Sequence, residues 1–193
     1  MGKTSLSRHR KTKETDVEID LDLGRPDEVT LNTGLPFFDH LLHAAAFHGG
    51  FSLHVAATGD IDVDPHHLVE DVGIVIGELL SELIEGGSFA RYGHAVVPMD
   101  DSLSTVTIDA GGRPFLVLQA DFPQARSGDF DMALIREFFT ALAHRGKITL
   151  HARCNYGLNS HHMAESLFKA LGIAIKAAFS STNRAIPSTK GKL

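Results

Sequence analysis

Two segments of this sequence share the pattern His-His-x-x-Glu, which combines the side chains that most often bind metal ions. The segments are His66-His67-x-x-Glu70 and His161-His162-x-x-Glu165. In an α-helix, side chains four residues apart lie about 40° from each other around the axis, whereas adjacent side chains lie about 100° apart. His66 and Glu70 can therefore bind one ion while His67 faces another. The second segment repeats this division, so each segment is predicted to contribute to two metal ions.

The remaining ligands follow if a repeat of the chain relates the two segments. His40 and Glu137 then occupy matched helix positions, and each can complete one site. Four nitrogen and oxygen ligands without sulfur suit Mn(II) or Fe(II) with open coordination positions, and zinc also accepts such ligands. Open positions indicate catalysis. We expect one ion to be bound by His40, His67, His161 and Glu165, and the other by His66, Glu70, Glu137 and His162.

Each segment taken alone has a less specific interpretation. One His-x-x-x-Glu on a helix is more often a solvated ion pair than a metal site, whereas two at matched positions, each with an extra histidine, are a much stronger signal. A structural or storage metal site is also compatible with the pattern. Among the other histidines, His54 and His151 are expected to be packing residues in strands, and His48 lies on the same helix face as His40, within reach of the site.

The elements that must position these residues occur twice in the same order. In the first half, the hydrophobic period predicts strands at 15–23, 28–33 and 51–57 and helices at 36–48 and 65–84. In the second half, it predicts strands at 94–99, 102–109, 114–120 and 148–153 and helices at 132–145 and 160–180. We therefore expect an α/β (α+β) fold with two related halves, residues 1–87 and 88–193, that together form one compact catalytic domain.

The repeat can be followed residue by residue. Leu53-His54-Val55 aligns with Leu150-His151-Ala152 at an offset of 97, and the same offset relates Gly49 to Gly146 and His40 to Glu137. The two His-His pairs are offset by 95, which requires only a two-residue difference in an intervening loop. Two half-domains packed about a pseudo-twofold axis are the simplest explanation.

Composition excludes several classes of protein. The chain has 193 residues, 43% of them hydrophobic, which is enough for a substantial core. Its net charge is −6 with both signs interspersed, so it lacks the basic stripe of a nucleic-acid binder. No segment approaches the roughly 20 apolar residues of a membrane span. The single cysteine, Cys154, and a polar amino terminus without a signal peptide favour a cytoplasmic location.

The motifs, taken together, resemble those of the imidazoleglycerol-phosphate dehydratase family. They run in order along nearly the whole chain: Arg10-x-Thr12-x-Glu14-Thr15, Asp39-His40-Leu41-Leu42, His48-Gly49, His66-His67-x-x-Glu70-Asp71, Pro98-Met99-Asp100, Gly112-Arg113-Pro114, Asn159-x-His161-His162-x-x-Glu165, Phe168-Lys169-Ala170 and Pro187-Ser188-Thr189-Lys190-Gly191. The resemblance implies a hydro-lyase that converts D-erythro-imidazole glycerol phosphate to imidazole acetol phosphate in histidine biosynthesis.

The same resemblance implies the architecture and the cofactor. It implies a duplicated half-domain of the ribosomal protein S5 domain 2-like type, with sheets packed on a helical layer. It also implies a homo-oligomer of 24 subunits, with two Mn(II) ions in each active site and sites between subunits. The family's ligand pattern maps onto the eight residues named above. Many relatives have histidine at the position of Glu137, which makes this ligand a departure from the family pattern.

Further site residues are assigned through the resemblance. Glu14 is the candidate for proton transfer, with His48 or a metal-bound water as rivals. Arg91 and Arg113 match the arginines that bind the substrate phosphate, and guanidinium groups suit phosphate geometry. The residues expected to contact substrate are Glu14, His40, His48, Arg91, Arg113, Lys169, Ser188, Thr189 and Lys190. Those of the carboxyl-terminal tail are expected to close over the substrate.

Two other functions remain open from the sequence. Paired metal ions also activate water, so a dinuclear hydrolase of phosphate esters is an alternative enzyme. It would release inorganic phosphate rather than a keto-phosphate. A metal-storage or scaffold shell is the alternative that is not an enzyme, and it would leave Arg91, Arg113 and Lys190 without a role.

Overall fold

The computed structural model describes residues 4–25, 28–86 and 89–182, and it contains two halves with the same order of elements. The first half consists of β1 (Ser5–Lys11), β2 (Thr15–Asp22), β3 (Val29–Asn32), α1 (Pro36–Gly49), β4 (Ser52–Gly59) and α2 (His66–Gly86). The second consists of β5 (Tyr92–Met99), β6 (Ser102–Asp109), β7 (Phe115–Gln119), β8 (Arg126–Ser127), β9 (Phe130–Asp131), α3 (Leu134–Arg145), β10 (Thr149–Tyr156) and α4 (Ser160–Ala178).

The two four-stranded sheets have equivalent topologies. Their strand orders are β1-β2-β4-β3 and β5-β6-β10-β7. In each sheet one pair is parallel, β3 with β4 and β7 with β10, and the other pairs are antiparallel. The short β8–β9 hairpin is an insertion in the second half. The expected duplicated α/β fold is therefore confirmed, whereas the proposed boundary at residues 87 and 88 falls outside the described residues.

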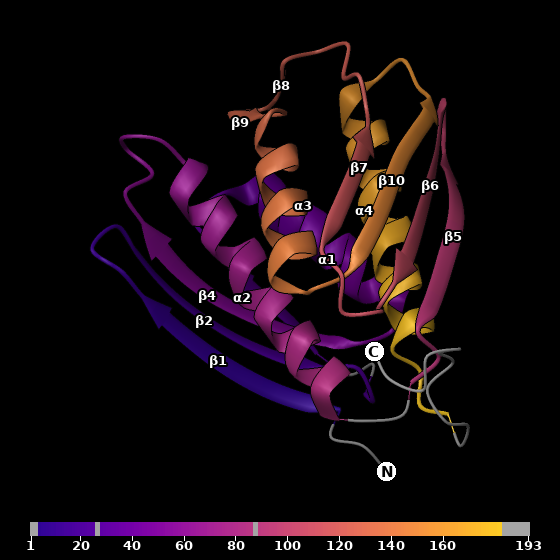
Figure 1. Cartoon of the computed structure of the whole chain (residues 1–193). Coiled ribbons are helices and arrows are strands. Elements are labelled where there is room, and N and C mark those ends of the chain that lie inside the picture. The colour runs from indigo at the N-terminus through magenta and orange to yellow at the C-terminus, as the bar shows by residue number, and fades with distance from the viewer. Residues whose placement is uncertain (1–3, 26–27, 87–88, 183–193) are drawn as a thin grey trace.

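The four helices lie between the two sheets (Figure 1). Helices α1 and α2 cover the first sheet, and α3 and α4 cover the second, so the halves meet helix against helix. Successive side chains of a strand point to opposite faces of its sheet. In β2, Val17, Ile19 and Leu21 are therefore buried against the helices, and the residues between them face outward. The core is continuous across both halves.

Two matched glycines bring the helices of different halves together. A side chain on Gly172 of α4 would lie 1.8 Å from the carbonyl oxygen of Ala45 in α1. A side chain on Gly77 of α2 would lie 2.9 Å from the carbonyl oxygen of Leu142 in α3. Gly77 and Gly172 are 95 residues apart, the offset of the two His-His pairs. The repeat therefore extends to the packing that places α1 beside α4 and α2 beside α3.

The structure corrects three details of the sequence analysis. Strand β1 lies in a segment that was expected to be only a basic, polar terminus, and β8 and β9 were not predicted. His54 and His151 are exposed on the outer faces of their sheets and are not packing residues. Their neighbours in β4 and β10 are buried, so strand alternation places both histidines outward. No helix among the described residues combines the length and the apolar character of a membrane span.

Candidate metal centre and active site

Three of the predicted metal ligands converge at the contact between α1 and α4. His40 Nε2 lies 3.2 Å from Glu165 Oε2, and His161 Nε2 lies 3.3 Å from the same oxygen. The ligand atoms of the three side chains all lie within 4.8 Å of one another. Within the described ranges, no other group of three or more histidine, cysteine or acidic side chains is arranged in this way. The sequence therefore predicted the members of this cluster, although they come from both halves.

Local packing fixes the orientation of the cluster. The Phe37 ring lies 5.0 Å from that of His161 and 6.1 Å from that of His40, between centroids. Glu165 is buried, and its Oε1 lies 2.8 Å from Lys169 Nζ one helical turn along. Burial by itself raises the pKa of Glu165, but hydrogen bonds from Lys169 and His40 outweigh it and lower the pKa overall. The carboxylate is thus kept in the charged form that a cation would need.

The amino termini of α2 and α4 are built alike. Asp64 Oδ1 accepts a hydrogen bond from the backbone N–H of His66 at 2.9 Å, and Asn159 Oδ1 accepts one from that of His161, also at 2.9 Å. These side chains satisfy amide groups that have no partner within the helix. Each cap therefore fixes the turn that carries a His-His pair.

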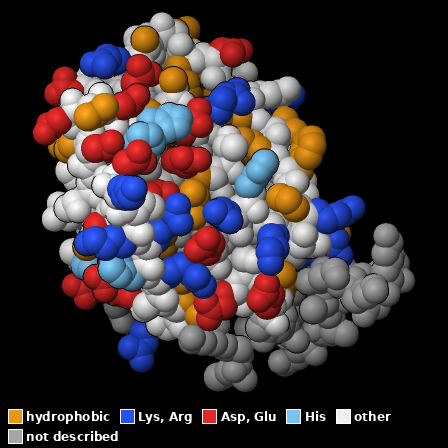
Figure 2. All heavy atoms as spheres, turned by 60° about the vertical axis from the view of Figure 1, so that its left-hand side comes forward, with side chains coloured by type: hydrophobic (Ala, Val, Ile, Leu, Met, Phe, Trp, Pro, Cys, Tyr) orange, Lys and Arg blue, Asp and Glu red, His pale blue; other side chains and the backbone are white. Residues whose placement is uncertain are grey.

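His67 lies in an acidic environment in this chain, separate from the cluster of His40, His161 and Glu165. Its Nδ1 lies 3.2 Å from Asp60 Oδ2 and 3.7 Å from Glu14 Oε2. The hydrogen bond with Asp60 is the main reason that the pKa of His67 is raised. Figure 2 shows histidine side chains beside acidic ones on the face that it presents. The chain therefore supplies three of the four predicted ligands of the first ion in one place, and the fourth elsewhere.

His162 has a corresponding carboxylate partner. Its Nδ1 lies 2.5 Å from Asp101 Oδ1, and its Nε2 lies 3.5 Å from Asp100 Oδ2. The other oxygen of Asp101 accepts backbone hydrogen bonds from Leu158 at 2.5 Å and Asn159 at 3.0 Å. The bond with His162, followed by that with Leu158, holds the pKa of Asp101 well below its usual range. Asp101 therefore remains charged and joins the β5–β6 turn to the start of α4.

The second predicted ligand set is not brought together within one chain. His66 and Glu70 lie on the first turns of α2, and Glu137 lies on the first turn of α3. Glu137 is half-buried beside Ala133 and Arg136 at the rim of a pocket of about 610 Å³. These residues do not form a cluster with His162 in the described part of the chain. Their role as ligands stays a prediction.

The two predicted phosphate-binding arginines meet at Asp109. Arg91 donates from Nε to Asp109 Oδ1 at 2.7 Å and from Nη2 to Oδ2 at 3.1 Å. Arg113 Nη2 lies 3.8 Å from Asp109 Oδ2, and its side chain is 76% exposed. The backbone N–H of Arg91 bonds to the carbonyl of Ala178, at the end of α4 opposite to His161. The length of α4 between these positions is about 25 Å, at 1.5 Å per residue.

The structure describes three of the remaining residues that were predicted to contact substrate. Glu14 is 57% exposed in the β1–β2 turn. His48 is exposed near the end of α1, and desolvation, followed by the charge of Lys169, lowers its pKa. Lys169 contacts Glu165 and Met99 Sδ, the latter at 3.2 Å. Ser188, Thr189 and Lys190 lie outside the described residues.

Sequence reasoning missed three acidic residues that hold these elements together. They are Asp60, Asp71 and Asp101. The buried Asp71 accepts hydrogen bonds from Arg10 Nε at 2.9 Å and from the Thr15 hydroxyl, so it ties the turn that carries Glu14 to α2. Asp71 is the last residue of the motif His66-His67-x-x-Glu70-Asp71, and Asp101 directly follows Pro98-Met99-Asp100, so these motifs were the available signal. For Asp60 the sequence offered none.

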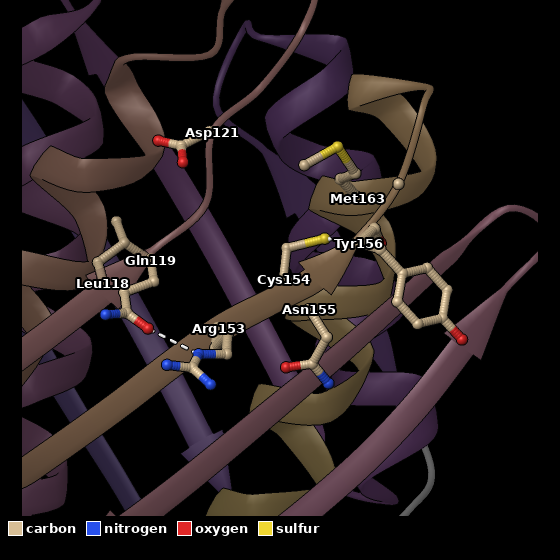
Figure 3. Close-up of a pocket in the computed structure, with 9 residues that line it drawn as sticks. Leu118, Gln119, Asp121, Arg153, Cys154, Asn155, Tyr156 and Met163 are labelled. Atoms are coloured by element: carbon tan, nitrogen blue, oxygen red, sulfur yellow. Dashed lines mark hydrogen bonds between the residues drawn. The ribbon is translucent and has the colours of Figure 1, made fainter.

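A pocket of about 720 Å³ lies beside the carboxyl ends of β7 and β10. In Figure 3 the side chains of Arg153 and Gln119 point toward each other, and Arg153 Nε donates to Gln119 Oε1 at 2.6 Å. Cys154 and Met163 also line the pocket. It contains none of the predicted ligands, so we do not assign the active site to it.

Comparisons with known proteins identify the family of this chain. Residues 33–175 match the family model described as imidazoleglycerol-phosphate dehydratase. A protein of that name from Exiguobacterium sp. is 51% identical over 94% of this chain and 94% of its own length. One from Bacillus cereus is 48% identical over 97% of this chain and 98% of its own.

Solved structures give the same result. The crystal structure of imidazoleglycerol-phosphate dehydratase from Staphylococcus aureus matches with a TM-score of 0.83 at 36% identity, covering 92% of this chain and 99% of that one. A structure from Pyrococcus furiosus matches with a TM-score of 0.86, also at 36% identity, covering 96% and 100%. The duplicated fold and its motifs therefore define an enzyme of the hydro-lyase class. The chain belongs to the imidazoleglycerol-phosphate dehydratase family.

Proposed function

We propose that this chain dehydrates D-erythro-imidazole glycerol phosphate to imidazole acetol phosphate in histidine biosynthesis, in the cytoplasm, with two Mn(II) ions in each active site. The observation that carries the proposal is the cluster of His40, His161 and Glu165, which joins α1 of one half to α4 of the other. The names of the relatives support the substrate and the reaction.

The donor set fits a metal ion. Two imidazole nitrogens and one charged carboxylate converge, and no sulfur is present, which suits Mn(II). We assign one ion to His40, His161 and Glu165 together with His67 of another subunit. The other ion is assigned to His66, Glu70 and Glu137 together with His162 of another subunit. Bound ions would act as Lewis acids toward the imidazole ring and favour its ionisation.

The names of substrate and product fix the bonds that change. The carbon next to the ring loses its hydroxyl group, the following carbon loses its proton, and the resulting enol becomes the ketone. Glu14 is our candidate for removing this proton, because its exposed carboxylate lies 3.7 Å from the proposed ligand His67. His48 is the alternative, since desolvation lowers its pKa and so favours the neutral ring, which can accept a proton.

The geometry of the phosphate-binding residues supports sites shared between subunits. Arg91 and Arg113 lie at one end of α4 and His161 at the other, about 25 Å away along the helix. A substrate with three carbons between ring and phosphate cannot reach both ends. Arg91 and Arg113 therefore act in the site of a neighbouring subunit, and Lys169, beside Glu165, acts close to its own cluster.

Exposed apolar residues support an assembly, which we propose to have 24 subunits. Val63 and Leu158 are 81% and 79% exposed, and Ile61 and Tyr156 are 36% and 62% exposed. The members of each pair are separated by 95 residues, so both halves present exposed apolar side chains shortly before a His-His pair. Clusters of exposed apolar side chains mark contact surfaces. These loops would bring neighbouring subunits to the proposed metal sites.

The decisive experiment follows the product. Purified protein, stripped of metal and then supplied with Mn(II), is mixed with D-erythro-imidazole glycerol phosphate. We expect imidazole acetol phosphate and no inorganic phosphate. Release of phosphate would instead identify a dinuclear hydrolase, and metal binding without turnover would identify a storage shell. A His161→Ala variant serves as the control for activity from contaminants.

A further inference from the structure

The two turns that precede β2 and β6 carry carboxylates at matched positions. Glu14 directly precedes Thr15, the first residue of β2, and Asp101 directly precedes Ser102, the first residue of β6. Strand pairing supports the match, because β4 and β10 pair antiparallel with β2 and β6, with equivalent registers apart from a shift between Cys154 and Tyr156. Each turn lies beside the second histidine of a His-His pair. The two turns therefore carry equivalent carboxylates, and the surroundings of Glu14 and Asp101 can be compared directly.

The surroundings of the two carboxylates differ. Asp101 contacts the His162 ring at 2.5 Å and accepts two backbone hydrogen bonds, and its side chain is 28% exposed. Glu14 is 57% exposed, and its contact with His67 is the longer one, 3.7 Å. In the first half, Asp60 takes the position at the ring instead, at 3.2 Å from His67 Nδ1, and it is 27% exposed.

Asp60 lies in the loop between β4 and α2, and the second half has no equivalent carboxylate. The corresponding loop of the second half, residues 157–159 between β10 and α4, contains no acidic residue. The first half therefore holds its histidine with a loop carboxylate, and the second half with a turn carboxylate. Among the described contacts, Asp60 is the carboxylate nearest to His67 Nδ1 in the first half. In the second half, Asp101 is the carboxylate nearest to His162 Nδ1.

From this arrangement we infer that Asp60 and Asp101 are positioning residues that orient His67 and His162 for metal binding and leave Glu14 free for chemistry. A carboxylate can only accept, so the hydrogen between each pair lies on the histidine Nδ1. The lone pair of the ring is then on Nε2, the nitrogen available to a cation. Such outer contacts fix the tautomer and the ring orientation of ligating histidines. The inference rests on the proposed function, because it assumes that both histidines bind metal.

Mn(II) affinity tests the inference separately from catalysis. Metal-free protein is titrated with Mn(II), and free Mn(II) is followed by electron paramagnetic resonance. Asp60→Ala removes the acceptor, whereas Asp60→Asn keeps a neutral one. The side chain of Asp60 contacts the His67 ring, and its backbone bonds are unaffected by either change. We expect Asp60→Ala to weaken binding of one ion per subunit by about 10- to 100-fold, and Asp60→Asn to lie between it and the wild type.

Two further variants complete the experiment. Asp101→Asn should weaken binding of the other ion, and Asp62→Ala, an exposed aspartate of the same loop, is the matched control. Assembled Asp60 and Asp101 variants that bind both ions as tightly as the wild type would overturn the inference while leaving the proposed function intact. A wild type that binds no Mn(II) would overturn both, and the wild-type titration alone reveals that case. Loss of affinity in Asp62→Ala equal to that in Asp60→Ala would also count against the inference.

Discussion

His40 and Glu165 belong to different halves of the chain, yet His40 Nε2 and Glu165 Oε2 lie 3.2 Å apart. The contact depends on the packing of α1 against α4, which Gly172 permits by leaving space for the backbone of Ala45. A metal ion bound by this pair would therefore link the two halves. Metal affinity and the stability of the folded subunit are coupled as a result.

Removal of metal should abolish activity and weaken the assembly. His40 comes from α1, and His161 and the buried Glu165 come from α4, so a cation bound by these three side chains would join the two helices. Activity after verified chelation should fall to background, light scattering should report a smaller particle, and Mn(II) should restore both. Chelated protein that keeps full activity would show that the metal assignment is wrong. Chelated protein that keeps its size would restrict the role of the metal to catalysis.

Glu14→Gln should reduce kcat by about 100-fold or more, the usual contribution of a positioned acid or base. The side chain is exposed and makes no short contact in the described structure, so folding and metal content should stay normal. The measurement is steady-state kinetics with metal analysis of the same sample. Glu18→Gln, an exposed glutamate on β2, is the matched control. Wild-type activity in Glu14→Gln would show that another group removes the proton, and His48 would be the first candidate.

The fold was largely predictable because periodicity and the repeat agree. Buried residues such as Val17 and Leu53 alternate with exposed ones, and the offsets of 95 and 97 relate α2 to α4 and α1 to α3. Strand β1 escaped prediction because only Leu6 of its seven residues is buried. Strands β8 and β9 have two residues each, which is too short for a periodic signal.

The site was predictable only in part, for a physical reason. Helical geometry determines which of His161 and His162 shares a face with Glu165, so a local rule was sufficient there. The partners of His67 depend on the path of the loop before α2, and the hydrophobic periodicity of the sequence does not determine that path. The distance between Arg91 and His161 depends on the packing of β5 against the end of α4. Neither relation can be inferred from spacing in the sequence.

Arg113→Ala should lower kcat/KM by about 10- to 100-fold, mainly through KM, because hydrogen bonds to charged groups contribute roughly 1.5–3 kcal/mol each. The side chain is largely exposed and lies 3.8 Å from Asp109, so its loss should not affect folding. Arg153→Ala, an exposed arginine on β10, is the control. Equal kinetics in Arg113→Ala and the wild type would remove Arg113 from the phosphate site.

Cys154 should react slowly with iodoacetamide at neutral pH. Burial raises the pKa of its thiol, and the thiolate is the reactive form. Because the folded pKa lies above the unfolded one, this thiol contributes stability that is fully present below the unfolded pKa and is lost as pH rises through the folded pKa. Alkylation rates of native and urea-unfolded protein, compared across pH, test this directly, since the chain has one cysteine. Equal rates at pH 8 would contradict the raised pKa.

His67→Ala should lower metal occupancy chiefly at the ion that His40, His161 and Glu165 bind, although His67 is adjacent in sequence to a proposed ligand of the other ion. The reason is geometric, because neighbouring helix positions diverge by about 100° and His66 and Glu70 share the other direction. In this chain His67 lies with Asp60 and Glu14 and is not part of the cluster, so under the proposed assignment His67 of a second subunit would supply the contact.

A crystal structure of the His67→Ala variant, with the anomalous signal of Mn(II), would show which ion is lost. His66→Ala should produce the opposite pattern, and His94→Ala, an exposed histidine on β5, should leave both ions in place. The pair of variants therefore distinguishes a specific ligand from a general loss of stability. If His66, His67 and Glu70 were found around one ion, the division of each segment between two metals would be wrong, and with it the reason for placing the sites between subunits.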